Sequence, residues 1–230
     1  MKKTISVSIV SLLAVVLVVT MAGCSNPVKN KAQLQAANES MQKAVQSRLT
    51  ELNSAVSDAT GKIASNGLEG EETRRILNGL CQRFPYLLDC STADIQGKMF
   101  TVMPDAYRRY EGADTTITEA SNKFLAELKA NKKPVLSNVF RSVEGVDAIV
   151  LVWPVISAKG ELIGDICALF KPELFMEDII GPQARAGGLK VNIMELDGMV
   201  NYCSNGTETG KNVLTDPLYK GYPELIAQAK

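Results

Sequence analysis

The sequence contains no histidine. Without it the chain cannot build a Ser-His-Asp or Cys-His catalytic unit, and it lacks the commonest general base at neutral pH. The sequence also has no metal-ligand cluster, no phosphate-binding glycine loop and no nucleophile elbow. We therefore expect no enzymatic activity, no metal and no cofactor.

An excess of charge of either sign is also missing. The chain has 25 Lys and Arg residues against 25 Asp and Glu residues, so its formal net charge is zero. Nucleic-acid binding depends on a basic surface and is therefore not expected. With 46% hydrophobic and 22% charged residues, the composition is that of an ordinary globular protein with one large or two small domains.

Long apolar runs are confined to the N-terminus. Lys2 and Lys3 precede an almost wholly apolar stretch at residues 5–19, and the small residues Ala22 and Gly23 follow it directly before Cys24. This layout is typical of an export signal. An uncleaved transmembrane anchor is the alternative, and the stretch only just allows it because a bilayer core needs about 20 apolar residues.

The segment Met21-Ala22-Gly23-Cys24 resembles the lipobox of bacterial-type lipoproteins, although Met21 stands where Leu is usual. The resemblance implies that residues 1–23 are removed as a signal peptide and that Cys24 carries lipid. Loss of Lys2 and Lys3 would leave 23 basic and 25 acidic residues, a net charge of −2. We expect a protein anchored in the cell membrane or outer envelope on the extracytoplasmic side.

Four further cysteines, Cys81, Cys90, Cys167 and Cys203, make an even number in an exported chain, which favours disulfides over metal binding. Three pairings are possible. We expect Cys81 to pair with Cys90, because a turn at Pro85 could close the short loop between them, and Cys167 to pair with Cys203. Alternatively, some of the four are simply small buried residues.

Residues 24–33 lack a periodic apolar pattern and are expected to form a lipidated tether. Apolar residues then recur at steps of three and four over residues 34–63, which predicts one long helix. Its apolar face permits two interpretations, a coiled-coil seam that dimerises or a helix that packs on its own domain.

The remaining pattern predicts an α+β fold. Helices are expected at residues 70–83, 118–130, 172–180 and 222–229, with Gly181-Pro182 closing the third of these. Strands are expected at residues 86–92, 98–103, 135–142, 148–156 and 162–170, the last three as an antiparallel meander, and at 189–196 and 199–203 as a hairpin.

Three short segments of this pattern, residues 134–137 (PVLS), 153–155 (WPV) and 160–164 (GELIG), resemble extracytoplasmic Cache sensor domains. Residues 194–198 (MELDG) and 210–212 (GKN) look like the opening of the second lobe of a double Cache domain. The resemblance implies a PAS-like antiparallel sheet with flanking helices after a long N-terminal helix. We accordingly predict a sensor domain at residues 34–182 and the start of a smaller second lobe at 183–230.

Cache domains bind small solutes such as amino acids, organic acids or amines, so the resemblance implies a small-molecule ligand. The amino-acid-binding subgroup carries an Arg-x-Trp-Tyr cluster ahead of the meander, whereas residues 119–130 contain neither arginine nor tryptophan. An α-amino acid is therefore not the expected ligand. The second lobe also stops at Lys230, before the usual further strands, so it must pack on the preceding sheet, pair with a partner or be truncated.

Candidate ligand groups come from two regions. Alternation along residues 147–156 puts Asp147 and Trp153, the only tryptophan, on one face of the sheet, and Arg141 and Asp165 belong to neighbouring strands. By resemblance, the segment around Arg109 forms the pocket lid, and its guanidinium could clamp a carboxylate. The predicted ligand-binding residues are Tyr107, Arg109, Tyr110, Arg141, Asp147, Trp153 and Asp165.

Each of these residues also has a purely structural interpretation. Arg141 and Asp147 could simply pair at the surface, Asp165 could be satisfied by backbone amides, and Tyr107 and Tyr110 could cap the core.

The sequence favours a lipid-anchored sensor module that binds a small molecule and acts with a membrane protein partner. The alternative is a structural or assembly lipoprotein that forms a homodimer through its N-terminal helix and binds no ligand.

Overall fold

The computed structural model describes residues 16–21, 27–221 and 226. The chain divides into two compact units. One is Arg48–Phe175, called here the pocket unit, and the other combines Met1–Ser47 with Met176–Lys230. Residues 34–47, which the sequence assigns to the sensor domain, group with the second unit.

The long helix α1 spans Pro27–Asn66. It begins inside the predicted tether, at a proline, which is favoured in the first turn because it has no amide hydrogen to leave unpaired. Within the pocket unit, its side chains Leu52, Val56 and Ile63 are all fully buried. This burial favours a helix that packs on its own domain, because the face needed for a coiled-coil seam is already covered.

The pocket unit is built on an antiparallel sheet with the strand order β3-β2-β7-β6-β4, and β5 pairs with β6. The strands are β2 (Leu87–Asp94), β3 (Met99–Met103), β4 (Val135–Leu136), β5 (Phe140–Arg141), β6 (Asp147–Ile156) and β7 (Leu162–Phe170). The predicted meander is confirmed.

The predicted strand at residues 135–142 is wrong in one respect, because it is split into β4 and β5. The cause lies at Ser137, whose backbone amide donates to the Val150 carbonyl. The Val150 amide then donates to the Ser137 side-chain Oγ at 3.0 Å. A hydroxyl takes the place of a backbone carbonyl there, which interrupts the regular ladder.

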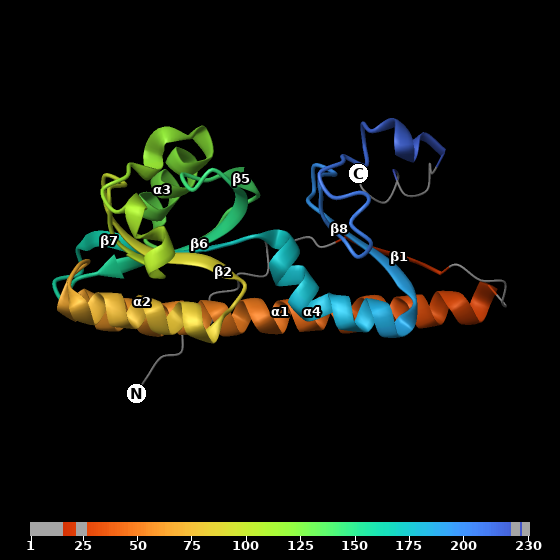
Figure 1. Ribbon diagram of the computed structural model, residues 1–230, viewed down its shortest axis with the longest axis horizontal. Helices are drawn as coiled ribbons and strands as arrows, with labels where there is room; N and C mark the ends of the chain where they lie inside the picture. Colours follow the sequence, from red (N-terminus) through yellow and green to blue (C-terminus); the bar gives the residue numbers. More distant parts are fainter. Residues whose placement is uncertain (1–15, 22–26, 222–225, 227–230) are drawn as a thin grey trace. The chain divides into compact units, whose positions relative to one another are not determined.

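Helices cover both faces of this sheet (Figure 1). On one face lie α2 (Glu71–Arg83) and the part of α1 from Arg48 onward. On the other face lies α3 (Glu119–Asn131), whose Leu125 and Leu128 pack in one apolar cluster with Val150 and Val152 of β6. Two 3₁₀ turns, η2 (Asp105–Tyr110) and η3 (Thr115–Ile117), join β3 to α3.

The second unit contains a three-stranded sheet in which β8 (Leu189–Met194) lies between β1 (Val16–Met21) and β9 (Val200–Cys203). The predicted hairpin of β8 and β9 is confirmed. Strand β1 falls inside the predicted signal peptide and pairs antiparallel with β8 along its whole length. Cys24 lies outside the described residues, and so does the predicted helix at 222–229 apart from Ile226.

Helix α4 spans Pro172–Gly187 and continues through Gly181-Pro182, where the sequence predicts its end. Proline removes one backbone hydrogen bond from a helix. The helix nevertheless continues because Ile180 and Ala184, on either side of this point, are both buried. Burial on both sides therefore outweighs the local signal to stop.

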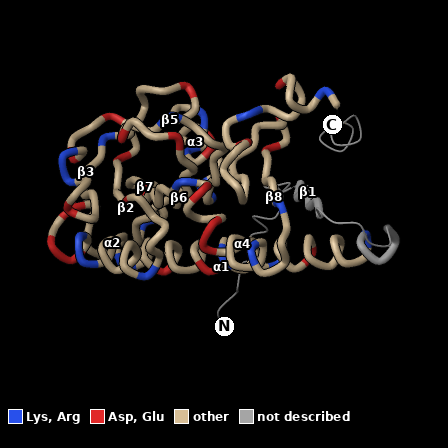
Figure 2. Tube along the Cα trace, turned by 45° about the vertical axis from the view of Figure 1, so that its right-hand side comes forward, with Lys and Arg blue, Asp and Glu red and all other residues tan. Residues whose placement is uncertain are grey.

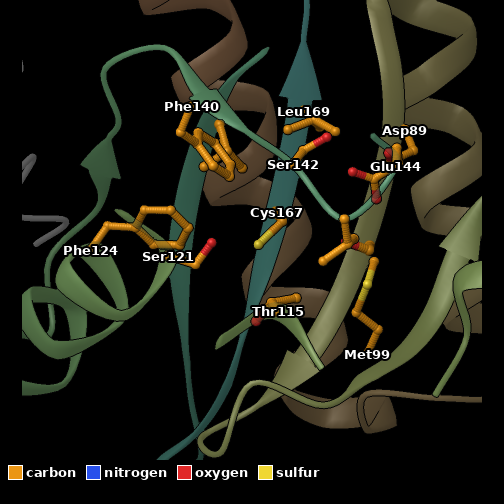
Figure 3. A pocket seen from close by; sticks show the side chains of 13 residues that line it. Asp89, Met99, Thr115, Ser121, Phe124, Phe140, Ser142, Glu144, Cys167 and Leu169 are labelled. Carbon is orange, nitrogen blue, oxygen red and sulfur yellow. The ribbon is translucent and has the colours of Figure 1, made fainter. Parts of the chain in front are cut away.

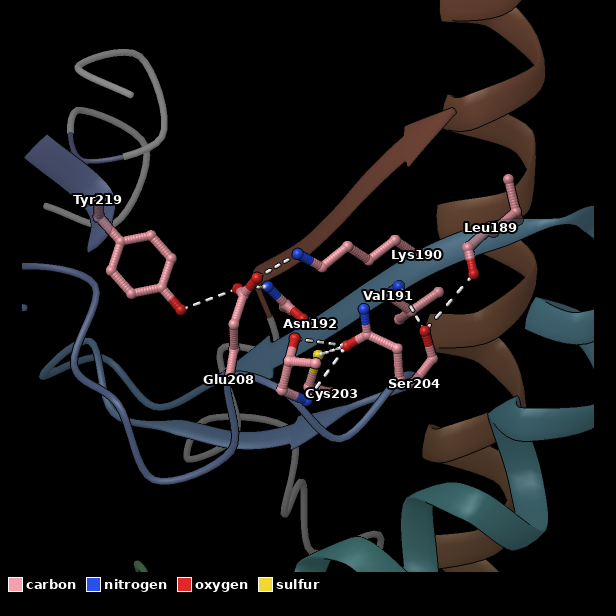
Figure 4. Close-up of polar contacts among 10 residues, drawn as sticks. Leu189, Lys190, Val191, Asn192, Cys203, Ser204, Glu208 and Tyr219 are labelled. Atoms are coloured by element: carbon pink, nitrogen blue, oxygen red, sulfur yellow. Dashed lines mark hydrogen bonds and ion pairs between the residues drawn. The ribbon is translucent and has the colours of Figure 1, made fainter. Parts of the chain in front are cut away.

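The loop after β9 is held by Glu208, which is almost fully buried and accepts hydrogen bonds from three side chains (Figure 4). Asn192 Nδ2 donates at 2.5 Å and the Tyr219 hydroxyl at 2.9 Å, and Lys190 forms an ion pair with the same carboxylate. These bonds lower the pKa of Glu208, although burial opposes them. The cluster joins β8 to the short helix η4 (Pro217–Gly221).

Acidic and basic residues are interspersed along the described part of the chain rather than gathered on one element (Figure 2). No helix among the described residues is both long and apolar enough to cross a membrane. The predicted α+β class with a long N-terminal helix is confirmed.

Candidate functional site

A pocket of about 380 Å³, measured out to the solvent at its mouth, lies in the pocket unit on the α3 side of the sheet. Its walls come from β2, β3, β6, β7, α3 and the segment around β5. The lining residues are Asp89, Ser91, Met99, Thr115, Ser121, Phe124, Phe140, Ser142, Val143, Glu144, Val150, Cys167 and Leu169.

One side of this pocket is acidic, with Asp89 of β2 close to Glu144 of the β5–β6 loop (Figure 3). Asp89 Oδ2, Glu144 Oε2 and Ser142 Oγ are buried, and none has a hydrogen-bond partner among the described residues. Buried polar atoms are almost always paired in folded proteins. Three unpaired oxygens lining one pocket make it the candidate ligand site.

The pKa of the Asp89 carboxyl is strongly raised. Its side chain is almost fully buried, and this desolvation, with smaller contributions from Glu144 and Cys81, raises the pKa of its carboxyl well above the usual value. An ionised Asp89 is therefore costly unless a positive charge stands beside it. The lining contains no Lys or Arg that could supply that charge.

The other side of the pocket is apolar. Phe124 of α3 and Phe140 of β5 meet edge to face, with ring centroids 5.5 Å apart. They lie across the pocket from Asp89 and Glu144 (Figure 3). Aromatic rings opposite carboxylates suit a compact organic cation, since rings attract a positive charge as well as apolar groups.

The floor between the two sides carries Cys167 of β7. Its thiol lies 3.4 Å from Asp165 Oδ1, and burial raises the pKa of the thiol well above its usual value. Burial also raises the pKa of Asp165 to about 7, against the lowering effect of the hydrogen bond from Cys167. Asp165, one of the predicted ligand residues, is buried beside Cys167 on the same face of β7 and does not line the pocket.

The predicted residue Trp153 lies on the opposite side of the sheet from the pocket. Its indole Nε1 donates to Asn53 Oδ1 of α1 at 2.8 Å. Alternation along β6 gives the pocket Val150 instead. Arg141 and Asp147 form an exposed ion pair at 3.3 Å outside the lining, which matches their structural interpretation.

The three predicted lid residues lie together on η2 and also stand outside the lining. Tyr107 and Tyr110 stack with ring centroids 6.3 Å apart, and the Arg109 guanidinium lies 4.9 Å from the Tyr110 ring centroid. The Tyr110 hydroxyl donates to the Glu144 carbonyl at 3.3 Å. Burial, with a smaller effect of Asp89, raises the pKa of Tyr107. The lid segment is therefore a neighbour of the acidic wall.

Sequence reasoning missed the acidic wall itself. Asp89 is the one charged residue in the apolar run at residues 86–90. A lone charge in such a run is the sequence signal that could have identified it. Ser142 and Glu144 belong to a predicted strand end and turn, where polar residues are ordinary. Their location beside Asp89 is a product of the tertiary fold.

All four cysteines of the described residues are free thiols, so neither predicted disulfide is present in the structure. Cys167 and Cys203 belong to different units, and each thiol has its own partner, Asp165 and Asn205 respectively. The Cys81 thiol donates to the Met103 carbonyl oxygen at 3.3 Å. Within the described residues, no group of three or more acidic or cysteine side chains could hold a metal ion.

Solved structures with the same fold come from bacterial receptors. An extracellular ligand binding receptor from Desulfohalobium retbaense is 26% identical with a TM-score of 0.67, over 78% of this chain and 33% of that protein. This chain therefore spans about a third of that receptor's length.

Two further structures are ligand-binding domains of chemoreceptors. That of CtaA from Pseudomonas fluorescens, in complex with L-valine, is 16% identical with a TM-score of 0.58, over 86% of this chain and 83% of that one. That of PctC from Pseudomonas aeruginosa, in complex with GABA, is 15% identical with a TM-score of 0.59, over 85% and 83%. At this identity the two structures establish the shared fold.

No curated protein sequence matches the chain. The family model described as "HK/GC/Chemotaxis protein-like, sensor domain" matches residues 47–172, which is more than half of the chain and nearly coincides with the pocket unit. The sensor fold expected from the sequence is thereby confirmed. The chain belongs to the family of HK/GC/chemotaxis protein-like sensor domains.

Proposed function

We propose that this protein is an extracytoplasmic sensor module that binds a small organic amine in its cationic form. The observation that carries the proposal is the acidic wall, in which buried oxygens of Asp89, Glu144 and Ser142 have no partner among the described residues. An ammonium group has three donors and a positive charge, so it matches these oxygens in number and in charge.

The charge balance of the pocket supports a cation over other solutes. Its titratable lining groups are two carboxylic acids and a thiol, and it contains no Lys or Arg. A carboxylate ligand would place a further negative charge beside Asp89 without a partner. A zwitterion would gain binding free energy at its ammonium group and lose it at its carboxylate.

The comparisons support the same class of ligand. The chemoreceptor domains similar to this chain were solved with L-valine and with GABA, which both carry an ammonium group. This chain lacks a cationic lining residue to receive the carboxylate that these ligands also carry. We therefore place its ligand among amines that have no adjacent carboxylate.

Attachment and signalling form the remaining part of the proposal. The N-terminal pattern that ends at Cys24 supports lipid anchoring on the extracytoplasmic side. Since a lipid anchor does not cross the bilayer, the ligand-bound state would be passed to a membrane protein partner.

Three matched probes test the ligand class by calorimetry. Leucine, 3-methylbutylamine and 4-methylpentanoate share one branched hydrocarbon. Leucine carries both charged groups, 3-methylbutylamine carries only the ammonium group, and 4-methylpentanoate carries only the carboxylate. We expect measurable affinity for the amine, weaker binding of leucine and none of the acid. Binding of the acid as tight as that of the amine would contradict the proposal.

Variants locate the site. Asp89→Asn should weaken amine binding at least about 30-fold, because it removes one member of a buried charge pair. Asp147→Asn is the matched control, since this carboxylate is exposed and outside the pocket. Equal loss of affinity in both variants would show that the effect is not local to the acidic wall.

A further inference from the structure

Behind the acidic wall, two cysteines from different elements lie near each other. Cys81 lies on α2 and is half-buried, whereas Cys90 lies on β2 and is fully buried. Cys81 Sγ donates to the Met103 carbonyl oxygen at 3.3 Å, and Met103 is the cross-strand neighbour of Cys90. The two thiols also influence each other's pKa. The fold thus places Cys81 of α2 against the backbone of β3 directly opposite Cys90.

The location of this pair connects it with the pocket. Successive side chains of a strand point to opposite faces of the sheet. Asp89 and Ser91 line the pocket, so Cys90 between them points to the face covered by α2. A bond between Cys81 and Cys90 would therefore tie α2 to the strand that carries Asp89.

The two thiols differ in reactivity. The neighbouring Cys90 thiol lowers the pKa of Cys81, although burial opposes this effect. The Cys81 thiol and complete burial raise the pKa of Cys90 well above its usual value. Since the thiolate is the attacking species, Cys81 is suited to attack first and Cys90 to follow.

We propose that Cys81 and Cys90 are an oxidation site, at which an external disulfide converts the pair into an intramolecular disulfide that fastens α2 to β2. Cys81 attacks one sulfur of the oxidant and releases one thiolate. Cys90 then attacks the Cys81 sulfur of the mixed disulfide and releases the second. Two electrons pass from the pair to the oxidant, and the two thiol protons go to the thiolates that leave.

Peptide mapping of the full chain, purified under reducing conditions and then treated with oxidised glutathione, tests the bond directly. Trypsin cleaves after Arg75, Arg83 and Lys98, which puts Cys81 in peptide 76–83 and Cys90 in peptide 84–98. We expect one linked species that is lighter than the two peptides by two hydrogen atoms and is split by a reductant. Recovery of both peptides unlinked would overturn the proposal.

Single variants test the order of attack. In Cys90→Ser, Cys81 should keep glutathione as a stable mixed disulfide, because the second thiol is missing. In Cys81→Ser, the buried Cys90 should stay unmodified. The control Cys203→Ser belongs to the other unit and should leave cross-linking unchanged. Faster modification of Cys90 than of Cys81 would contradict the assigned roles.

Thermal unfolding distinguishes a site that the fold has built from chance oxidation. A disulfide formed without strain restricts the unfolded chain, so oxidation should raise the melting temperature by about 5 °C. A lower melting temperature after oxidation would overturn the proposal, because the fold would then oppose the bond. All three measurements are made without ligand, so their failure is separable from failure of the proposed amine binding.

Discussion

At the scale of single residues, a main feature of the described part of the chain is that two buried carboxyl groups, Asp89 and Asp165, form no ion pair. Asp89 lines the pocket, Asp165 lies on the same face of the sheet outside the lining, and burial is the largest cause of the raised pKa of each. Such groups cost stability when they ionise. A binding role accounts for that cost at Asp89, because a cationic ligand would offset it.

The pKa of Asp89 predicts how amine binding depends on pH. The ammonium ion needs an ionised carboxylate, and the pKa of Asp89 without ligand is raised. Affinity for 3-methylbutylamine should therefore fall as the pH drops through that raised pKa, with uptake of a proton on release of the ligand. Calorimetry in buffers of different ionisation enthalpy measures the proton count. Binding without any exchange of protons at every pH would contradict the prediction.

Asp165 predicts a pH dependence of stability. Its pKa is about 7 in the folded chain and about 4 in an unfolded one, so the folded state binds more protons in between. The free energy of unfolding should then decline as the pH rises from 4 to 7, by at most about 4 kcal/mol, and stay level above 7. Asp165→Asn should flatten this decline in urea titrations. If unfolding free energy fell with pH equally steeply in the variant, the decline would belong to another titrating group.

The sequence indicated residue types better than it indicated their surroundings. Trp153 was selected as the only tryptophan, and alternation grouped it with Asp147 on one face. Alternation does not tell which face of a sheet bears the pocket, because both faces here are covered by helices. Asp89 was missed for the same reason, since its unpaired oxygen depends on what packs against β2.

At the scale of elements, close strand packing depends on one small residue. A Cβ atom at Gly164 of β7 would lie 2.2 Å from the Ala93 carbonyl oxygen and 2.6 Å from a methyl group of Leu68. Backbone cannot yield as a flexible side chain does. Gly164→Ala should therefore lower the free energy of unfolding by about 3 kcal/mol, measured by urea denaturation.

Gly79 of α2 provides the matched control, since a Cβ atom there would meet nothing within 4 Å. Gly79→Ala should leave stability unchanged or raise it by up to about 1 kcal/mol, because alanine is the better helix former. A similar loss in both variants would contradict the packing argument.

The contact between α1 and β6 gives a prediction that separates stability from binding. Trp153→Phe keeps an aromatic ring but removes the donor to Asn53 Oδ1, so it should cost about 1–2 kcal/mol of stability. Affinity for 3-methylbutylamine should stay within about twofold, as the indole is outside the pocket. A large loss of affinity would instead assign Trp153 to the binding site.

Most elements were predictable because their signals are local. Periodic apolar residues indicated α1, α2 and α3, and turn residues indicated the meander and the β8–β9 hairpin. The errors occurred where a contact between distant residues prevailed, at Ser137, whose hydroxyl interrupts a strand, and at Pro182, which a helix with buried neighbours accommodates. The relevant partners are not visible in a short sequence window.

At the scale of the whole molecule, Cys24 is the predicted point of membrane attachment. Cys24→Ala should move the protein from the membrane to the soluble fraction and abolish incorporation of labelled fatty acid, while amine affinity stays the same. Fractionation with a lipid-labelling assay measures both. Continued membrane association of the variant would favour an uncleaved N-terminal anchor.

The sequence by itself determined the α+β class, the long N-terminal helix, the meander, the β8–β9 hairpin and the sensor family, because these depend on periodicity, turns and motifs along the chain. Only the tertiary structure decided where the pocket lies and which charge it offers. Asp89, Ser142 and Glu144 converge through pairing of β2 with β7 and of β5 with β6. The burial that raises the pKa of the Asp89 carboxyl arises only once those strands and α3 have packed.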